Sequence, residues 1–95
     1  ENNILSIPED FSLDQNYPNP FNPSTIISWQ SPVGSYQTLK VFDVLGNEVV
    51  TLVNEFKPAG SYSVTFEAGN LSSGIYYYTI SAGDFHQTKK LVLLK

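Results

Sequence analysis

The single histidine, His86, is the side chain around which a serine triad or a zinc site would have to be built, because the chain contains no cysteine. Asp84 lies close to it in the sequence, and serines are plentiful. If this segment is a strand, Asp84 and His86 share one face beside a hairpin, where no helix terminus or cleft is indicated that would activate a nucleophile. We therefore predict that His86 is a surface residue.

Carboxylate pairs offer no better site for acid/base chemistry. The acidic residues considered are spread along the chain without a spacing that encodes such a pair: Glu9, Asp10, Asp43, Glu48 and Glu67. The sequence therefore predicts that the chain is not an enzyme and that it needs no cofactor.

One kinked segment offers oxygen atoms that would suit calcium, from Asp14, Asn16, Asn19 and Asn22. Two of these asparagines stand directly before a proline. An asparagine in that position can accept hydrogen bonds from backbone N–H groups at a turn, while the proline fixes the local geometry. We therefore predict a structural turn in this segment rather than a metal site.

Aromatic residues make up 14% of the chain and raise the possibility of a platform on which sugars stack. The candidates for such an exposed platform are Tyr36, Phe42, Phe56 and Tyr77. A sandwich without cysteine needs most of its aromatic side chains in the core. The platform therefore stays the weaker of the two interpretations.

Length and charge exclude several classes of function. The chain has 95 residues, enough for one domain with a real core. Its net charge of −4, with five lysines and no arginine, provides no basic surface for nucleic acid. The longest apolar runs, 75–78 and 91–94, are far shorter than the roughly 20 residues of a membrane-spanning helix. We expect a monomer without a membrane-spanning segment, cut from a longer polypeptide because no initiator methionine is present.

The elements that must position these side chains are strands. Val, Ile, Thr and aromatic residues are abundant, and glycines and prolines divide the chain beyond Pro23 into stretches of strand length. Gly83 and Asp84 predict a two-residue hairpin turn. The predicted strands are 25–30, 36–43, a short one at 48–53 bounded by Asn54, 61–68, 75–82 and 85–94, with a further short one near 11–13.

About seven short strands with connections too short for crossover helices predict an all-β fold, an immunoglobulin-like antiparallel β-sandwich. Both faces of 75–82 are fairly apolar, as expected of a central strand. Tyr76 or Tyr78 is a candidate for a backward hydrogen bond of the tyrosine-corner type. The predicted core residues are Trp29, Leu39, Val41, Val64, Phe66 and Ile80.

The last residues, 88–95, place a dibasic pair before a strongly β-prone apolar run. One interpretation is a final strand whose lysines guard a sheet edge against aggregation. The other is a terminal strand that a partner grips by β-augmentation after it peels from the edge. Both can hold at once.

Five blocks of the sequence, 13–25, 39–49, 58–60, 71–78 and 88–95, occur in an order that closely resembles one known family, the C-terminal sorting domain, type A, of the type IX (Por) secretion system. The resemblance implies a signal on a larger secreted protein. Its cargo would lie on the N-terminal side, would pass through the periplasm, and would cross the outer membrane through a translocon to the cell surface or the medium. A sorting peptidase is the second implied partner.

The resemblance also implies roles for individual residues. The signal would reside in Lys89, Lys90, Leu91, Val92, Leu93, Leu94 and Lys95. A structural signature would comprise Asn19, Pro20, Phe21, Asn22, Pro23, Gly46, Gly60 and Gly74. Asn47 and Thr79 depart from the family pattern, which often has a basic residue at these places, so a basic patch on that face is less expected.

These observations predict two parts of the chain. Residues 1–10 would be the end of a linker or a frayed terminus, and residues 11–95 the sorting domain. The alternative functions are a carbohydrate-binding or adhesive immunoglobulin-like module of a secreted enzyme and a purely structural spacer. A sorting signal must stand at the C-terminus of its protein, whereas a binding module or a spacer need not.

Overall fold

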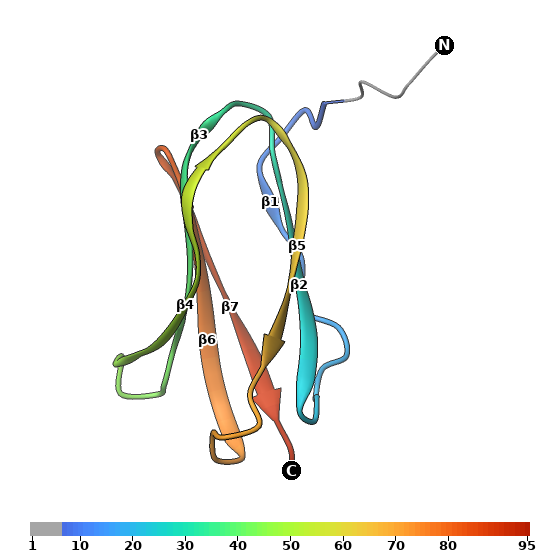
Figure 1. The fold of residues 1–95 in the computed structure, drawn as a ribbon, viewed down its shortest axis with the longest axis vertical. Helices are drawn as coiled ribbons and strands as arrows, with labels where there is room; N and C mark the ends of the chain where they lie inside the picture. Colours follow the sequence, from blue (N-terminus) through green and yellow to red (C-terminus); the bar gives the residue numbers. More distant parts are fainter. Residues whose placement is uncertain (1–6) are drawn as a thin grey trace.

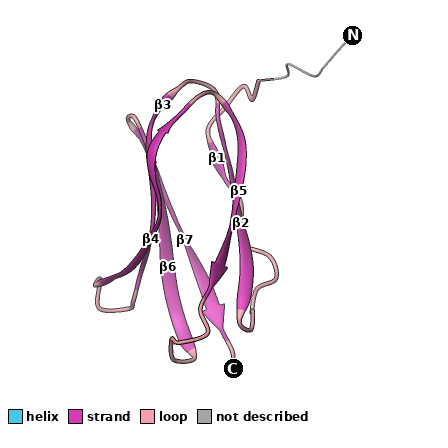
Figure 2. Cartoon of the chain, in the orientation of Figure 1, coloured by secondary structure: helices cyan, strands magenta, loops and turns pink. Residues whose placement is uncertain are grey.

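The computed structural model describes residues 7–95 as two facing layers of strands (Figure 1). Within this range there are strands and loops and no helix (Figure 2). The part of the predicted linker at residues 1–6 lies outside the described residues. The strands are β1 (Ser12–Leu13), β2 (Ser24–Ser31), β3 (Ser35–Phe42), β4 (Glu48–Lys57), β5 (Gly60–Glu67), β6 (Gly74–Ala82) and β7 (Phe85–Leu93).

The strands form two antiparallel sheets. One has the order β1-β2-β5 and the other β4-β3-β6-β7, so β7 is an edge strand. This arrangement confirms the predicted immunoglobulin-like β-sandwich of seven strands.

The core lies between the sheets because each strand alternates apolar and polar residues. Trp29, Leu39, Val41, Phe66 and Ile80 are buried there as predicted. Val64 is only half-buried and packs against the core from β5, which is the edge strand on the other side of the sandwich. The remaining buried hydrophobic residues of this core are Leu13, Phe21, Ile27, Val53, Ala68, Tyr76, Tyr78, Leu91 and Leu93.

One of the predicted strand boundaries was wrong. β4 does not end before Asn54 but continues to Lys57, because it pairs with β3 as far as Ser35. β6 is central in its sheet, as predicted, and only one of its faces is covered, because the sandwich has two layers. Ile75 and Tyr77 on its outer face are 40% and 37% exposed.

Two turns depend on glycine. Gly83 has φ of 60° in the two-residue turn between β6 and β7, where Ala82 pairs with Phe85, as predicted. Gly46 has φ of 87° in the turn between β3 and β4. There the Asp43 carboxylate accepts the N–H groups of Leu45 and Asn47, and the bond from Asn47 is the main reason why the pKa of Asp43 lies below its usual value.

Candidate recognition site at the last strand

The predicted signal residues are divided between the two sides of β7. Leu91 and Leu93 point into the core and are fully buried. Lys90 and Val92 point away from the core, and Leu94, just beyond the strand, is 56% exposed. Because residues alternate along a strand, Lys89 and Lys90 lie on opposite faces and do not form one basic patch.

The segment between β1 and β2, residues 15–23, lies along the outer edge of β7, and we call it the strap. The Phe21 N–H donates to the Val92 carbonyl, and the Phe21 carbonyl accepts from the Leu94 N–H, both at 3.0 Å. The Asn19 Oδ1 accepts from the Val92 N–H at 2.9 Å. At the upper end of this contact the Gln15 side chain donates to the Lys90 carbonyl at 2.7 Å. The edge of β7 is therefore paired on its strap side from Lys90 to Leu94.

The strap is tied to the core by a buried tyrosine. The Tyr78 hydroxyl, on β6, donates to the Asp14 carbonyl at 2.7 Å and accepts from the Asn16 N–H at 2.8 Å. The Asn16 side chain is itself buried, and its amide donates to Thr25 and to the Pro18 carbonyl. These polar groups satisfy one another, as buried polar groups must.

Two of the four residues considered as calcium ligands use their side-chain oxygens in hydrogen bonds. The side-chain oxygens of Asn16 and Asn19 accept hydrogen bonds from Gln15 and from β7. Asp14 and Asn22 are exposed. In residues 7–95 no group of three or more His, Asp or Glu residues is placed so that it could hold a metal ion.

The other signature residues occupy strand ends and the core. The Phe21 ring is buried 5.9 Å from the Phe66 ring, and the Pro23 carbonyl accepts the Ala68 N–H. Gly60 stands opposite Ser31 at the start of β5. The remaining ones are Pro20 and Asn22, both exposed in the strap, Gly46 in the β3–β4 turn, and Gly74 opposite Leu93.

Tyr76 makes the predicted backward bond. Its hydroxyl donates to the carbonyl of Ser72, four residues upstream, at 2.7 Å. Tyr78 instead reaches the strap. Adjacent inward tyrosines of β6 therefore fix the connection before β6 and the segment that covers β7.

Comparison with known families decides between the rival functions. Residues 15–94, which include the strap and all of β7, match the family described as "Secretion system C-terminal sorting domain". The chain belongs to this family. A comparison with curated proteins gave no match.

The sorting domain is a C-terminal signal for type IX secretion, and proteins that carry such a signal are exported through the envelope to the cell surface or the extracellular space. The family is not a catalytic one, and it implies a cargo on the N-terminal side of the same chain and the type IX machinery as a partner. The match favours the sorting function over the carbohydrate-binding alternative. Residues 7–95 of the sorting domain contain no helix long and apolar enough to span a membrane.

His86 and Asp84 lie where the sequence predicted them, at the β6–β7 hairpin, and both are exposed. The His86 Nδ1 is 2.9 Å from the Ser81 hydroxyl on the neighbouring strand. Asp84 is in the turn itself and makes no hydrogen bond to His86 within the described part of the chain. No base is therefore oriented by a third group, as a triad would require.

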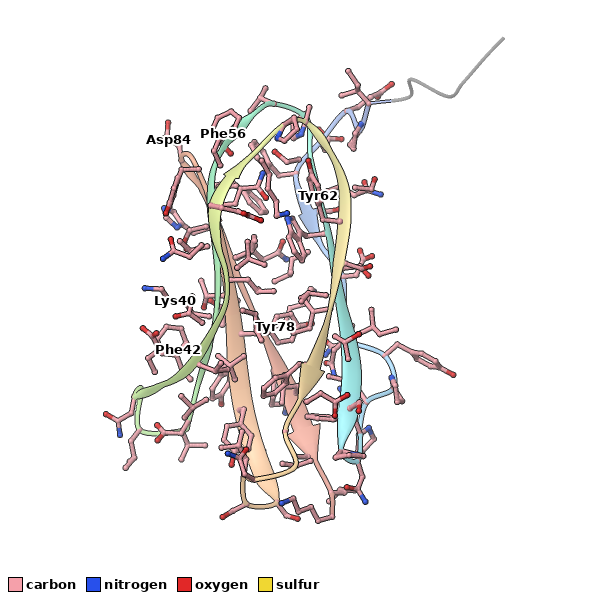
Figure 3. The ribbon with its side chains drawn as sticks, viewed as in Figure 1. Lys40, Phe42, Phe56, Tyr62, Tyr78 and Asp84 are labelled. Carbon is pink, nitrogen blue, oxygen red and sulfur yellow. The ribbon has the colours of Figure 1, made fainter. Side chains whose placement is uncertain are left out.

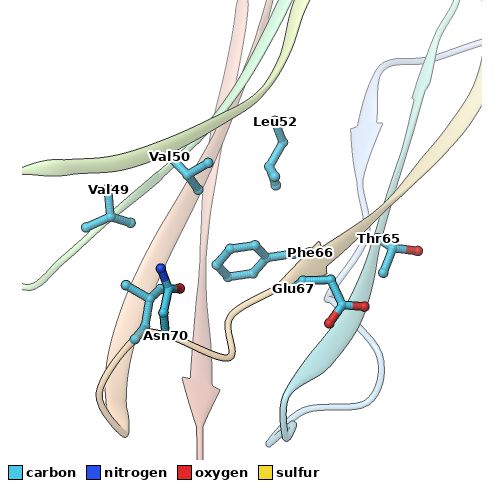
Figure 4. A pocket seen from close by; sticks show the side chains of 8 residues that line it. Val49, Val50, Leu52, Thr65, Phe66, Glu67 and Asn70 are labelled. Carbon is cyan, nitrogen blue, oxygen red and sulfur yellow. The ribbon is translucent and has the colours of Figure 1, made fainter.

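A cleft of about 420 Å³ lies on the open side of the sandwich, between the edge strands β4 and β5 (Figure 4). Its lining is mainly apolar and includes Phe66 and Leu71. Glu67 is the one titratable residue among its lining residues, so the cleft holds no pair of groups for acid/base chemistry.

Sequence reasoning missed the partnership between the strap and β7. Gln15 and Asn19 bind a strand more than 70 positions away, and nothing local to either segment indicates this contact. The one hint in the sequence was that the blocks 13–25 and 88–95 occur together. Their joint occurrence does not indicate that the two segments are in contact.

We expect the sorting domain to lose stability between about pH 10 and pH 12 through Tyr78. Burial raises the pKa of Tyr78 to about 12 from its ordinary value of 10.0. Folding therefore favours the neutral hydroxyl. The contribution of Tyr78 to stability is complete below the pKa that its hydroxyl has in the unfolded chain. It is lost as the pH rises through the higher pKa that the hydroxyl has in the folded domain.

Urea unfolding of the wild-type domain and of Tyr78→Phe, from pH 8 to pH 12, measures this effect. At pH 8 the variant should be less stable by about 1–3 kcal/mol, because the Asn16 N–H and the Asp14 carbonyl lose their partner. The difference should shrink between pH 10 and pH 12 as the wild-type hydroxyl ionises. A difference that stays constant over this range would contradict the expectation.

Proposed function

We propose that the type IX machinery recognises the sorting domain at the folded edge of β7, through residues 89–95. One observation carries this proposal: β7 is an edge strand whose Lys90, Val92 and Leu94 side chains point away from the core. In this proposal residues 11–95 form the signal domain, the cargo precedes it, and the domain performs no catalysis.

Burial supports recognition of β7 in place rather than after peeling. Leu91 and Leu93 are fully buried, and removing one such side chain from a core costs about 2–5 kcal/mol. The strap also pairs with the backbone from Lys90 to Leu94. Detaching the strand would break both sets of contacts. A receptor that binds the outward side chains of the folded strand therefore faces a lower free-energy barrier than one that must first detach the strand.

The first half of β7 offers backbone groups as well. Because Ala82 and Phe85 flank a two-residue hairpin, the odd-numbered residues of β7 bond to β6 and the N–H and C=O groups of His86 and Thr88 face the edge. Within the described residues these groups have no hydrogen-bond partner. A receptor strand could add here by β-augmentation, and the lysines nearby would disfavour wrong partners.

The partners of this edge are the outer-membrane translocon and the sorting peptidase that the family resemblance implies. Lys90 carries no ion pair within residues 7–95, which leaves its charge available to an acidic receptor group. The same edge would be read first for export and then for processing.

Export of a reporter tests this proposal. A reporter enzyme with an inner-membrane export signal is fused ahead of residues 1–95 in a bacterium with an active type IX system, and surface activity is measured. Leu94→Asp should lower surface activity by about tenfold, as expected when a contact residue is made repulsive. Ile26→Asp is the matched control, because Ile26 is similarly exposed, at 49%, on the other sheet.

The melting temperatures of both variants should equal that of the wild type, because both side chains face solvent. Equal surface activity of the Leu94→Asp and Ile26→Asp fusions would show that the machinery does not recognise the edge of β7. Folded Leu94→Asp domain with its cargo retained in the periplasm is the result that supports the proposal.

A further inference from the structure

The two outer faces of the sandwich differ in chemistry. The outer face of β2 and β5 is polar except for Ile26, with Ser28, Gln30, Ser61, Ser63, Thr65 and Glu67. The outer face of the other sheet carries apolar side chains at both ends: Tyr36 lies opposite Phe56 at one end, and a second group on β3, β6 and β7 lies towards the other end. An outer sheet face of a monomeric domain needs no apolar residues for folding, so such a group on one face alone indicates a contact surface.

Strand register places these side chains next to one another. Phe42 on β3 stands opposite Tyr77 on β6, and Ile75 on β6 stands opposite Val92 on β7. Side chains in such positions lie about 5 Å apart at Cβ, close enough to form one surface. Strand β3 and the β6–β7 hairpin, which lie more than 30 residues apart in the sequence, therefore contribute to a single apolar group.

Two lysines border this group. Lys90 stands opposite Tyr77, and Lys40 is the next outward residue of β3 after Phe42. The Lys40 ammonium lies 3.6 Å from the Glu48 carboxylate, whereas Lys90 is exposed and has no ion pair within the described residues. In a domain of net charge −4 this end of the sheet thus combines the half-buried Phe42 ring and the partly exposed Tyr77 ring with a positive charge that has no ion pair within the described residues.

We name these six residues, Phe42, Ile75, Tyr77, Val92, Lys40 and Lys90, the outer patch. Figure 3 shows Lys40 and Phe42 on the outer side of their sheet and Tyr78 between the two sheets. The patch lies towards the end of the sandwich where the chain reaches its C-terminal residues, while the described chain enters at the opposite end, beside β1 (Figure 1). A cargo joined at that entry is remote from the patch and leaves it free for another protein.

We propose that the outer patch docks on a protein component of the type IX machinery whose contact surface has an apolar centre and carboxylates at its rim. The apolar side chains of the patch would be desolvated at the centre, and Lys90 would meet the carboxylates. This proposal rests on the proposed recognition at β7, with which the patch is continuous through Lys90 and Val92.

The consequence is that the signal is a composite surface of the folded domain. Phe42 and Tyr77 come from internal strands, so a peptide that contained only residues 89–95 would lack four of the six patch residues. The strap and the buried Leu91 and Leu93 then serve to hold Lys90 and Val92 in register with β6.

The reporter fusion provides the test, with a control pair on the same sheet face. In one variant Phe42→Ser and Tyr77→Ser are combined. In the other, Tyr36→Ser and Phe56→Ser are combined, because these two rings also stand opposite each other, at the far end of β3, and are 58% and 63% exposed. Surface activity should fall about tenfold or more in the first variant and stay within about twofold of wild type in the second.

Folding is checked separately on the purified domains by circular dichroism and thermal melting. Phe42→Tyr with Tyr77→Phe keeps both rings and should restore export. If the serine pair at positions 42 and 77 does not fold, Lys90→Glu replaces it, since that side chain is exposed and its reversal opposes an acidic partner. Equal loss of export in the two serine variants would contradict the proposed docking at the outer patch. Undiminished export of folded Phe42→Ser/Tyr77→Ser, or of Lys90→Glu, would contradict it as well.

The two proposals fail in different ways. Equal surface activity of the Leu94→Asp and Ile26→Asp fusions would overturn the proposed recognition at β7. The other outcome is that the wild type is exported normally, Leu94→Asp loses export, and Phe42→Ser/Tyr77→Ser keeps it. This result would support recognition at β7 and contradict docking at the outer patch.

Discussion

Trp29→Ala should lower the free energy of unfolding by about 3–5 kcal/mol, a large part of the roughly 5–15 kcal/mol that stabilises a domain. Trp29 is 2% exposed, and its indole lies 5.8 Å from the Tyr62 ring between the sheets. Alanine would leave a large cavity there. Urea unfolding followed by circular dichroism measures the loss, and Gln30→Ala, at the exposed neighbouring position, should change little.

The indole also donates to the buried side-chain carbonyl of Gln37 at 2.9 Å. Trp29→Phe fills most of the volume but removes this donor, so we expect a smaller loss of about 1–3 kcal/mol from the unpaired acceptor. A loss below 1 kcal/mol in Trp29→Ala would show that Trp29 does not contribute to the core as its burial implies.

Leu91→Ala should destabilise the domain by about 2–5 kcal/mol, whereas Leu94→Ala should change its stability by less than about 0.5 kcal/mol. The two leucines are three positions apart in the same predicted signal, yet Leu91 is fully buried and Leu94 is 56% exposed. Thermal melting of both variants, under identical conditions, measures the contrast. Similar losses in the two variants would contradict the orientation of β7.

This contrast changes how truncation of the signal should be interpreted. The sequence suggests that deleting residues 89–95 would leave the rest of the domain at least partly folded, as expected of a strand that peels easily. The deletion removes Leu91 and Leu93 from the core and the partners of Phe21 and Asn19 from the strap. We therefore expect the truncated domain to unfold, so that loss of export in it would not identify a recognition residue.

The strands show which features of the fold the hydrophobic periodicity of the sequence can predict. Alternation along 61–68 predicted β5 and its buried face, and Gly83-Asp84 predicted the β6–β7 turn, because both signals are local to a few consecutive residues. The end of β4 was missed because it depends on how far β3 extends as a partner, which is not encoded within 48–57. The apolar residues on both faces of 75–82 correctly predicted a central strand. They did not indicate that its outer face would stay uncovered, because that depends on the number of layers in the fold.

The sequence alone determined the fold class and the family, because alternation, turn residues and motif order can all be read along the chain. Tertiary structure decided which residues of the predicted signal, 89–95, are accessible. It buried Leu91 and Leu93, presented Lys90 and Val92, laid the strap along β7, and joined Phe42 and Tyr77 into one surface. The physical reason is that burial, edge pairing and surface neighbours depend on contacts between strands, and the order of strands in a sheet does not follow the order of residues in the chain.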